Sequence, residues 1–374
     1  AVLSGLRMVS AAADLAARGM LHPVMPGLIG YPTLWVHQQR VFEAVRRGEH
    51  VLVATGTGSG KTEAFLHPIV DDLLRQRDQG VTAGLSAVLV YPMNALANDQ
   101  LERLRDMLAG TGVTFGQWVG TTPDKERDVA IEQFPSSSRQ AYLAERKKRK
   151  DAALGENRAA RPIAPLEECR SEEDIRARKP RILITNYRQL EILTTRWPDV
   201  SLFAGAPLKY LVFDEAHTYE GAVGAEVACL IRRVRALAGK TPDEVTCIGT
   251  SATLADPDKA KGDHEAAAKR FASRFFGVDE NKVTLVGESY VAREWPGGRI
   301  KTAPPLGDGM ERVNRLLKAM SDPVDLPALK AVIEELTGQM IDLGEDWARS
   351  LFQHLLANEY VYQTTQVLSE PKLL

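Results

Sequence analysis

The sequence has few cysteines, no excess of charge of either sign and no long apolar run, and each absence excludes a class of protein. Cys169, Cys229 and Cys247 are scattered and form no CxxC pair, so we expect neither a disulfide framework nor a structural zinc site, and a cytoplasmic location fits. The net charge is only −2, so any contact with nucleic acid must come from local patches. No apolar run reaches membrane-spanning length, and no membrane partner is expected.

The central part of the chain alternates between strand-like and helix-like segments. Continuous apolar strands separated by helices are typical of a parallel sheet that is covered on both faces. We therefore predict an α/β domain with a central parallel sheet, in which ligands bind at the carboxyl ends of the strands. The strand candidates are Val51–Ala54, Ala87–Tyr91, Thr114–Val119, Ile182–Thr185, Tyr210–Phe213 and Thr246–Thr250.

Changes in composition along the chain predict three regions. We interpret residues 1–30 as an N-terminal helical extension with a helix over Met8–Arg18, and residues 31–257 as the α/β domain. Residues 258–374 are expected to form a mainly helical accessory or linker region, in which Val283–Gly287 has the pattern of a strand. The helix candidates there are Asp263–Phe276, Met310–Met320, Leu326–Leu336 and Glu345–Leu356.

The alternation breaks between about Pro123 and Lys179, which indicates an insertion between two strands. Its predicted helix, Ala141–Ala153, contains the basic run 146–150, with sequence RKKRK. This run could contact a phosphate backbone. The alternative is a solvated helix face, which is the more frequent role of such a run.

The glycine-rich segment 54–62, with sequence ATGTGSGKT, follows the first apolar strand and precedes a helical stretch. Strand, glycine-rich loop and helix are the layout of a nucleotide phosphate cradle, in which backbone N–H groups and the helix N-terminus face the phosphates. Lys61 would reach the β- and γ-phosphates of a nucleotide, and the Thr62 hydroxyl would hold Mg²⁺. The alternative is a flexible turn. The other expected phosphate-binding residues are Thr57, Gly58, Ser59 and Gly60.

A second chemical signal is the sequence Asp214-Glu215-Ala216-His217 at the end of an apolar strand. Asp214 would bind Mg²⁺, and Glu215 would act as general base toward the attacking water. His217 is placed to link the nucleotide site to a neighbouring segment. The hydroxyl side chains of Ser251 and Thr253 follow the next strand and could hydrogen-bond to these groups, although such a Ser/Thr pattern alone is also typical of a turn.

In this order the motifs resemble those of superfamily 2 helicases of the DEAD/DEAH type. The resemblance implies a RecA-like P-loop domain that uses ATP and Mg²⁺. The segment 34–38, with sequence LWVHQ, is similar to the adenine-reading motif of these proteins, so Gln38 would contact the base, with Trp35 or Tyr31 packing nearby. For Trp35, core packing is the alternative.

The resemblance also implies nucleic-acid contacts at three loops. They lie near 90–100, at Gly120-Thr121-Thr122 and at Thr185-Asn186-Tyr187. The residues that match the family's backbone-contacting motifs are Pro92, Asn94, Ala95, Gly120, Thr185, Asn186 and Tyr187. Met93-Asn94 stands where most members have Thr-Arg, and Thr185-Asn186-Tyr187 replaces Thr-Pro-Gly. Both departures look closer to MrfA-type repair helicases and to helicases of phage-defence systems such as DISARM and Druantia. That branch implies single-stranded or partly duplex DNA as partner, with 3′→5′ polarity.

No second set of motor motifs follows Thr253, and no segment resembles the one that supplies an arginine finger. Because the chain begins at Ala1 without methionine, we expect a fragment that hydrolyses ATP poorly without a second RecA-like domain, in cis or in trans. The leading interpretation is the motor domain of a DNA helicase or translocase in repair or anti-phage defence. The alternatives are an RNA helicase, or a nucleic-acid-binding structural subunit of a defence complex with little turnover.

Overall fold

The computed structural model describes residues 8–56, 58–155, 161–251 and 264–287, and a few short stretches beyond residue 310 of which 325–337 is the longest. The chain divides into two compact units, residues 1–291 and residues 292–374. The first unit contains every described residue of the predicted nucleotide and nucleic-acid sites.

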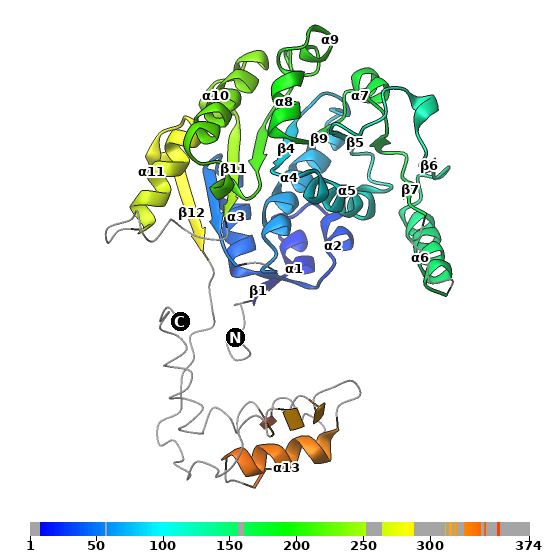
Figure 1. The fold of residues 1–374 in the computed structure, drawn as a ribbon, viewed down its shortest axis with the longest axis vertical. Helices are drawn as coiled ribbons and strands as arrows, with labels where there is room; N and C mark the ends of the chain where they lie inside the picture. Colours follow the sequence, from blue (N-terminus) through cyan, green and yellow to red (C-terminus); the bar gives the residue numbers. More distant parts are fainter. Residues whose placement is uncertain are drawn as a thin grey trace. The chain divides into compact units, whose positions relative to one another are not determined.

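An eight-stranded parallel sheet forms the centre of the first unit, in the order β12-β3-β11-β10-β4-β9-β5-β8 (Figure 1). The predicted parallel α/β sheet is confirmed. The strands are β3 (His50–Ala54), β4 (Ala87–Tyr91), β5 (Phe115–Trp118), β8 (Glu168–Cys169), β9 (Ile182–Asn186), β10 (Tyr210–Phe213), β11 (Thr246–Ser251) and β12 (Val283–Gly287).

Alternate residues along each strand enter two separate hydrophobic clusters, one on each face of the sheet. On β3, for example, Val51 and Val53 pack into one cluster and Leu52 into the other. This burial on both faces explains the uninterrupted apolar runs in the sequence. The first cluster takes residues from α3 (Val36–Arg46), α4 (Lys61–Asp78) and α5 (Asn94–Leu108). The second takes residues from α7 (Glu172–Arg178), α8 (Tyr187–Leu193), α10 (Gly221–Leu237) and α11 (His264–Phe276).

The N-terminal segment departs from the predicted single helix over Met8–Arg18. Its first residues form β1 (Met8–Ala11), which pairs antiparallel with β2 (Thr33–Trp35), and only α1 (Ala12–Ala17) is helical. The short helix α2 (Met25–Leu28) follows. Pairing with β2 satisfies backbone groups of β1, so this tertiary contact outweighs the local helix preference.

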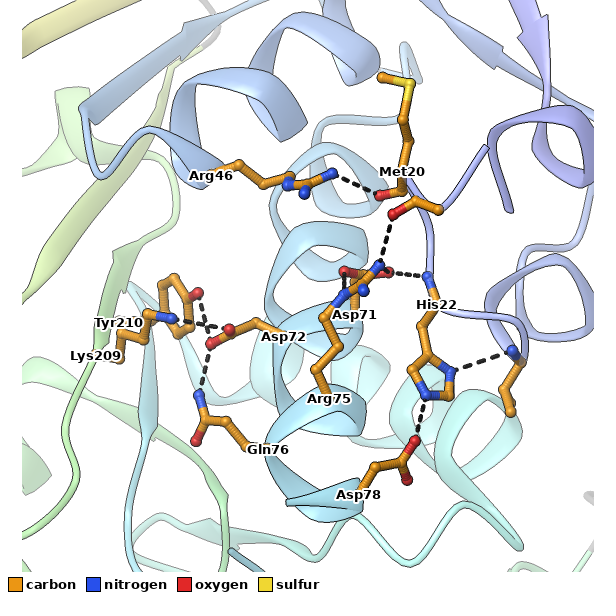
Figure 2. Close-up of polar contacts among 12 residues, drawn as sticks. Met20, His22, Arg46, Asp71, Asp72, Arg75, Gln76, Asp78, Lys209 and Tyr210 are labelled. Atoms are coloured by element: carbon orange, nitrogen blue, oxygen red, sulfur yellow. Dashed lines mark hydrogen bonds and ion pairs between the residues drawn. The ribbon is translucent and has the colours of Figure 1, made fainter. Parts of the chain in front are cut away.

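Polar contacts fix the N-terminal segment against α4 (Figure 2). The backbone N–H of His22 donates to Asp71, and the His22 ring lies 2.7 Å from Oδ2 of Asp78. Arg75 donates to the same Asp71 carboxylate at 2.7 Å. On another side of α4, Asp72 accepts hydrogen bonds from Lys209 and from the Tyr210 hydroxyl at 2.8 and 2.9 Å. Helix α4, which begins at Lys61, is therefore held by both the N-terminal segment and β10.

The sheet unit extends beyond the predicted boundary at residue 257. Strand β12 pairs in parallel with β3, and Phe275, Phe276 and Val283 are buried in the cluster that also covers β10. The predicted strand Val283–Gly287 thus belongs to the sheet rather than to a separate accessory region.

The predicted insertion lies between β5 and β9. It contains β6 (Glu132–Gln133), α6 (Arg139–Gly155), β7 (Ile163–Ala164), β8 and α7. The predicted helix Ala141–Ala153 lies within α6. Strands β6 and β7 form their own pair, whereas β8 extends the main sheet.

In the second unit, α13 (Leu326–Thr337) coincides with the predicted helix Leu326–Leu336. Leu329 and Ile333 of this helix are buried with Ala319 and Ile341. The candidates Met310–Met320 and Glu345–Leu356 fall largely outside the described residues. Among the helices that the structure describes, none is long and apolar enough to cross a membrane.

Candidate nucleotide-binding and nucleic-acid-binding site

The glycine-rich loop connects β3 to α4, as the sequence predicts. Gly58 and Gly60 have φ angles of +77° and +81°, which favour glycine because a Cβ is strained there. A Cβ on Gly60 would also lie 2.6 Å from Nε2 of Gln38. The Ser59 hydroxyl donates to Oγ1 of Thr55 at 2.7 Å and thereby closes the loop. Thr57 lies outside the described residues.

Lys61 opens α4 and directs a buried ammonium group toward the end of β10. Its side chain is 9% exposed, and its Nζ atom lies 3.5 Å from Oε1 of Glu215. Nζ has no hydrogen-bond partner among the described residues. A buried cation with unused donors and one nearby carboxylate is suited to an anionic ligand. Thr62 follows in the first turn of the helix, where the helix N-terminus also favours negative charge.

The two carboxylates at the end of β10 are organised by one hydroxyl group from β11. Thr250 donates through Oγ1 to Oδ1 of Asp214 at 2.5 Å and accepts from the backbone N–H of Glu215 at 2.9 Å. Asp214 is 8% exposed. Burial raises the pKa of its carboxyl group, and the hydrogen bond from Thr250 opposes this shift. Glu215 has a φ angle of +50°, a left-handed conformation that is uncommon for residues other than glycine.

His217 joins this group to the end of β11. Its Nδ1 atom lies 3.3 Å from Oε2 of Glu215 and 3.4 Å from the Ser251 hydroxyl. The structure therefore brings His217 and Ser251 together, as expected for a coupling contact. Thr253 lies outside the described residues.

A pocket of about 500 Å³ lies beside the glycine-rich loop. Its lining includes Tyr31, Trp35, Gly60, Lys61 and Thr62. The placement of Trp35 at the pocket agrees with the nucleotide interpretation rather than with core packing alone. Two charged lining residues, Glu63 and Arg103, form an ion pair there and were not anticipated. No sequence motif marks Arg103, because it reaches the pocket only through the packing of α5 beside α4.

Gln38 lies beside the phosphate loop, and its predicted contact with the base stays a prediction. Its side chain is 2% exposed. The amide accepts from the Trp35 backbone N–H at 3.0 Å and donates to the Gly60 carbonyl at 3.3 Å. The amide oxygen and the amide nitrogen both form hydrogen bonds within the protein. Gln38 thus connects Trp35 to the phosphate loop.

The predicted nucleic-acid contacts gather at the carboxyl ends of three neighbouring strands, β4, β9 and β5. Asn186, at the end of β9, donates through Nδ2 to Oδ1 of Asn94 at 2.8 Å and accepts from the Gln189 N–H, which caps α8. Asn94, Ala95 and Gly120 are exposed, and Pro92 is half-buried.

Thr185 is less available to a ligand than expected, whereas Tyr187 is half-buried. Thr185 is fully buried and donates to the Trp118 carbonyl at 2.7 Å. Its hydroxyl therefore joins β9 to β5 and is not available to a ligand. The Tyr187 ring packs edge-on against Tyr219, with centroids 5.8 Å apart.

The donor set fits a magnesium–nucleoside triphosphate. The Lys61 ammonium has unused donors, Asp214 is a buried carboxylate, and Thr62 carries its hydroxyl in the first turn of α4, next to Lys61. Oxygen ligands of this kind suit Mg²⁺ when it is shared with phosphates.

Comparison with known proteins gives consistent matches. The family described as DEAD/DEAH box helicase matches residues 35–141 and 143–260. The Druantia protein DruE of Escherichia coli (strain UMEA 4076-1) is 32% identical over 294 residues, a match that covers 60% of this chain and 16% of DruE.

Two groups of solved structures are also similar. The DUF1998 helicase MrfA bound to DNA is 22% identical with a TM-score of 0.47, and the match covers 92% of this chain and 42% of MrfA. The DEAD-box helicase Mss116 bound to ssRNA and UDP-BeF is 19% identical with a TM-score of 0.51, and the match covers 76% of this chain and 46% of Mss116. The chain thus spans only a part of each of these proteins.

Proposed function

Because the chain belongs to the DEAD/DEAH box helicase family, we propose that it is the first RecA-like motor domain of an ATP-dependent DNA helicase or translocase. The observation that carries this proposal is the meeting of Lys61, Asp214 and Glu215 at one edge of the sheet. The exposed residues Asn94 and Gly120 lie at the ends of strands along the same edge.

Each residue of the nucleotide site has a role that its position supports. Magnesium-bound ATP supplies the phosphoryl group that is transferred to water. Lys61 would neutralise phosphate charge, and Thr62 and Asp214 would hold Mg²⁺. Glu215 accepts a proton from the attacking water, and its strained backbone directs the carboxylate toward Lys61. If Lys61 turned from Glu215 to the phosphates when a nucleotide binds, the Glu215 carboxylate would be free to act as general base.

His217 and Ser251 are suited to pass the state of the site to the rest of the motor. His217 contacts both Glu215 and Ser251, and Ser251 is the last residue of β11. A change in the position of Glu215 would therefore change the position of the segment that follows β11.

Asn94, Ala95, Gly120 and Asn186 would hold the phosphate and sugar groups of the track. Such contacts carry no base information, so they permit stepping along any sequence. A second RecA-like domain, in cis or in trans, would supply the arginine that completes the ATPase site, an addition worth on the order of 10³–10⁵ in rate. This chain alone is therefore expected to hydrolyse ATP slowly.

DNA is proposed as the track on the strength of the motif departures at Met93-Asn94 and Thr185-Asn186-Tyr187. The similar structures do not decide this point, since MrfA is described with DNA and Mss116 with ssRNA. The similarity to a Druantia protein favours a role in anti-phage defence, with DNA repair as the other context.

The test is the ATPase rate of the full-length protein with matched DNA and RNA single strands. Stimulation by DNA well above that by RNA supports the proposal, and the reverse order assigns the motor to RNA. Binding of either polymer without stimulated turnover would instead support a structural subunit of a defence complex.

A further inference from the structure

We propose that helix α6 of the insertion is a second contact surface for nucleic-acid phosphates, formed by Lys147, Lys148 and Lys150. The inference rests on the proposed function, because it extends the track beyond the loops that follow β4, β9 and β5. It assigns a binding role to a basic run that, from its sequence alone, would more often be a solvated helix face.

The structure divides the five cations of the run into two groups. Arg146 donates to Glu102 at 2.8 Å and lies 3.0 Å from Asp106, both on α5. Arg149 contacts Glu132 and Glu145 at 2.9 and 2.8 Å. The two arginines thus attach α6 to α5 and to β6.

The buried side of α6 has further anchors. Tyr142 is buried, and its hydroxyl donates to the Ile163 carbonyl at 3.0 Å. Arg139 donates to the Met107 carbonyl, at the end of α5, at 2.7 Å. The orientation of α6 about its own axis is therefore set by contacts that do not involve the lysines.

Lys147, Lys148 and Lys150 are exposed on the remaining surface. None of them forms an ion pair with a residue that the structure describes. Helix α6 contains six cations and two anions, a net charge of +4, in a chain whose net charge is −2, so the other residues together carry −6. Positive charge is therefore concentrated on this one helix of an acidic chain, which favours a polyanionic partner.

The location of α6 selects nucleic acid as that partner. The sheet order is β4, β9, β5, β8, so the three predicted contact loops follow neighbouring strands and lead toward the β8 edge. Figure 1 shows α6 beyond β5, on the side of the sheet opposite to β12. The helix is attached to α5 at Glu102, which lies eight residues after Asn94, or about 12 Å along the helix axis. A nucleic-acid strand that continues from the three loops toward β8 would therefore extend toward α6.

The test compares the full-length protein with the triple variant Lys147→Gln, Lys148→Gln and Lys150→Gln. Glutamine has a helix propensity close to that of lysine. Arg146, Arg149 and Tyr142, which attach α6 to its neighbours, are left unchanged. The matched control removes three cations from α11, at the other end of the sheet, by Lys269→Gln, Arg270→Gln and Arg274→Gln. The probes are a DNA single strand and the same strand with a duplex extension, measured between 50 and 200 mM salt.

We expect the α6 variant to bind one or both probes about tenfold more weakly at 50 mM salt. The plot of log K against log salt should become less steep, with a slope that is less negative by about 2 to 3. The α11 control should match the parent. The probe with the larger loss identifies whether single-stranded or duplex phosphates reach the lysines. The maximal DNA-stimulated ATPase rate should be unchanged, while the DNA concentration for half-maximal stimulation rises.

Equal affinity and equal salt slope in the parent and in the α6 variant, with both probes, would overturn this inference and leave the motor assignment intact. The same holds if the α11 control loses as much affinity as the α6 variant. If the parent binds neither DNA probe at 50 mM salt, the proposed function as a DNA motor itself fails.

Discussion

The Nζ atom of Lys61 lies 3.5 Å from Oε1 of Glu215. These residues stand at the start of α4 and just after β10, two elements that are far apart in the sequence. Their approach joins the glycine-rich loop to the paired carboxylates in a single site. Without it, the two motifs would be unrelated loops on one sheet.

The first prediction concerns these two residues. Lys61→Ala removes the buried cation that faces the phosphates, and Glu215→Gln removes the general base while it retains the side-chain shape. Each is expected to lower the nucleic-acid-stimulated ATPase rate of the full-length protein by on the order of 10²-fold or more. Lys209→Ala, which removes a lysine paired with Asp72 away from the site, is the control and should retain the rate. Near-parental turnover in both site variants would refute the roles assigned to them.

The second prediction concerns the hydroxyl that links the carboxylates. Thr250→Val keeps the shape of the side chain but deprives Asp214 of its donor and the Glu215 N–H of its acceptor. We expect a loss of about 1–3 kcal/mol in the free energy of unfolding at neutral pH. We also expect a higher Mg²⁺ concentration for half-maximal ATPase activity. Thr250→Ser retains the hydroxyl and should remain close to the parent, so equal Mg²⁺ requirements in the valine and serine variants would contradict the argument.

The third prediction separates capping from nucleic-acid contact at Asn186. Asn186→Ala removes the cap of α8 and should cost about 1 kcal/mol of stability. Asn186→Asp keeps an acceptor for the Gln189 N–H, but it cannot donate to Asn94 and adds a negative charge beside the track. The aspartate variant should therefore fold normally and need roughly tenfold more DNA for half-maximal ATPase stimulation. Normal DNA dependence in this variant would remove Asn186 from the contact surface.

The sheet and the nucleotide loops could be predicted because their physical causes are local. Strands buried on both faces must be continuously apolar, and a phosphate loop needs glycine where φ is positive, as at Gly58 and Gly60. The same reasoning predicted the carboxylates at the end of β10. These features depend on a few neighbouring residues, so a single sequence reveals them.

The features that could not be predicted depend on contacts between distant segments. Met8–Ala11 has no strand pattern of its own and is extended only because β2 lies beside it. Thr185 is hidden because β9 lies inside the sheet. The pairing of Arg103 with Glu63 depends on how α5 lies against α4. None of these packing relationships is encoded by a short pattern.

The fourth prediction concerns the junction between the insertion and α5. Arg105 donates twice to Glu168, at 2.6 Å in each case, and both residues are buried. Arg105→Met would leave the Glu168 carboxylate without its partner, at a cost of about 3–5 kcal/mol in the free energy of unfolding. Adding Glu168→Leu removes that buried charge, so the double variant should recover most of the loss. Additive destabilisation in chemical unfolding of the four proteins would show that the two side chains do not act as a pair.

The fifth prediction concerns acid stability and His50, the first residue of the strand that leads into the phosphate loop. His50 is 1% exposed, and its Nδ1 accepts from the Cys247 N–H at 3.1 Å. Burial, with a contribution from Arg235, lowers its pKa from 6.5 to about 4. In the unfolded chain, His50 therefore binds a proton below about pH 6.5, whereas in the folded chain it does so only below about pH 4. Stability attributable to His50 is present above pH 6.5 and is lost as the pH falls, by up to about 3 kcal/mol.

His50→Gln retains an acceptor for the Cys247 N–H but has no titrating group. The variant should lose about 3 kcal/mol less than the parent between pH 7 and pH 4, whatever its stability at pH 7. His67 provides a matched comparison, because burial also lowers its pKa to about 4, and His67→Gln should flatten the same pH window. Chemical unfolding at intervals across this range measures the slopes. Parallel curves for the parent and His50→Gln would show that the pKa of His50 is the same in the folded and unfolded chains, and would contradict the prediction.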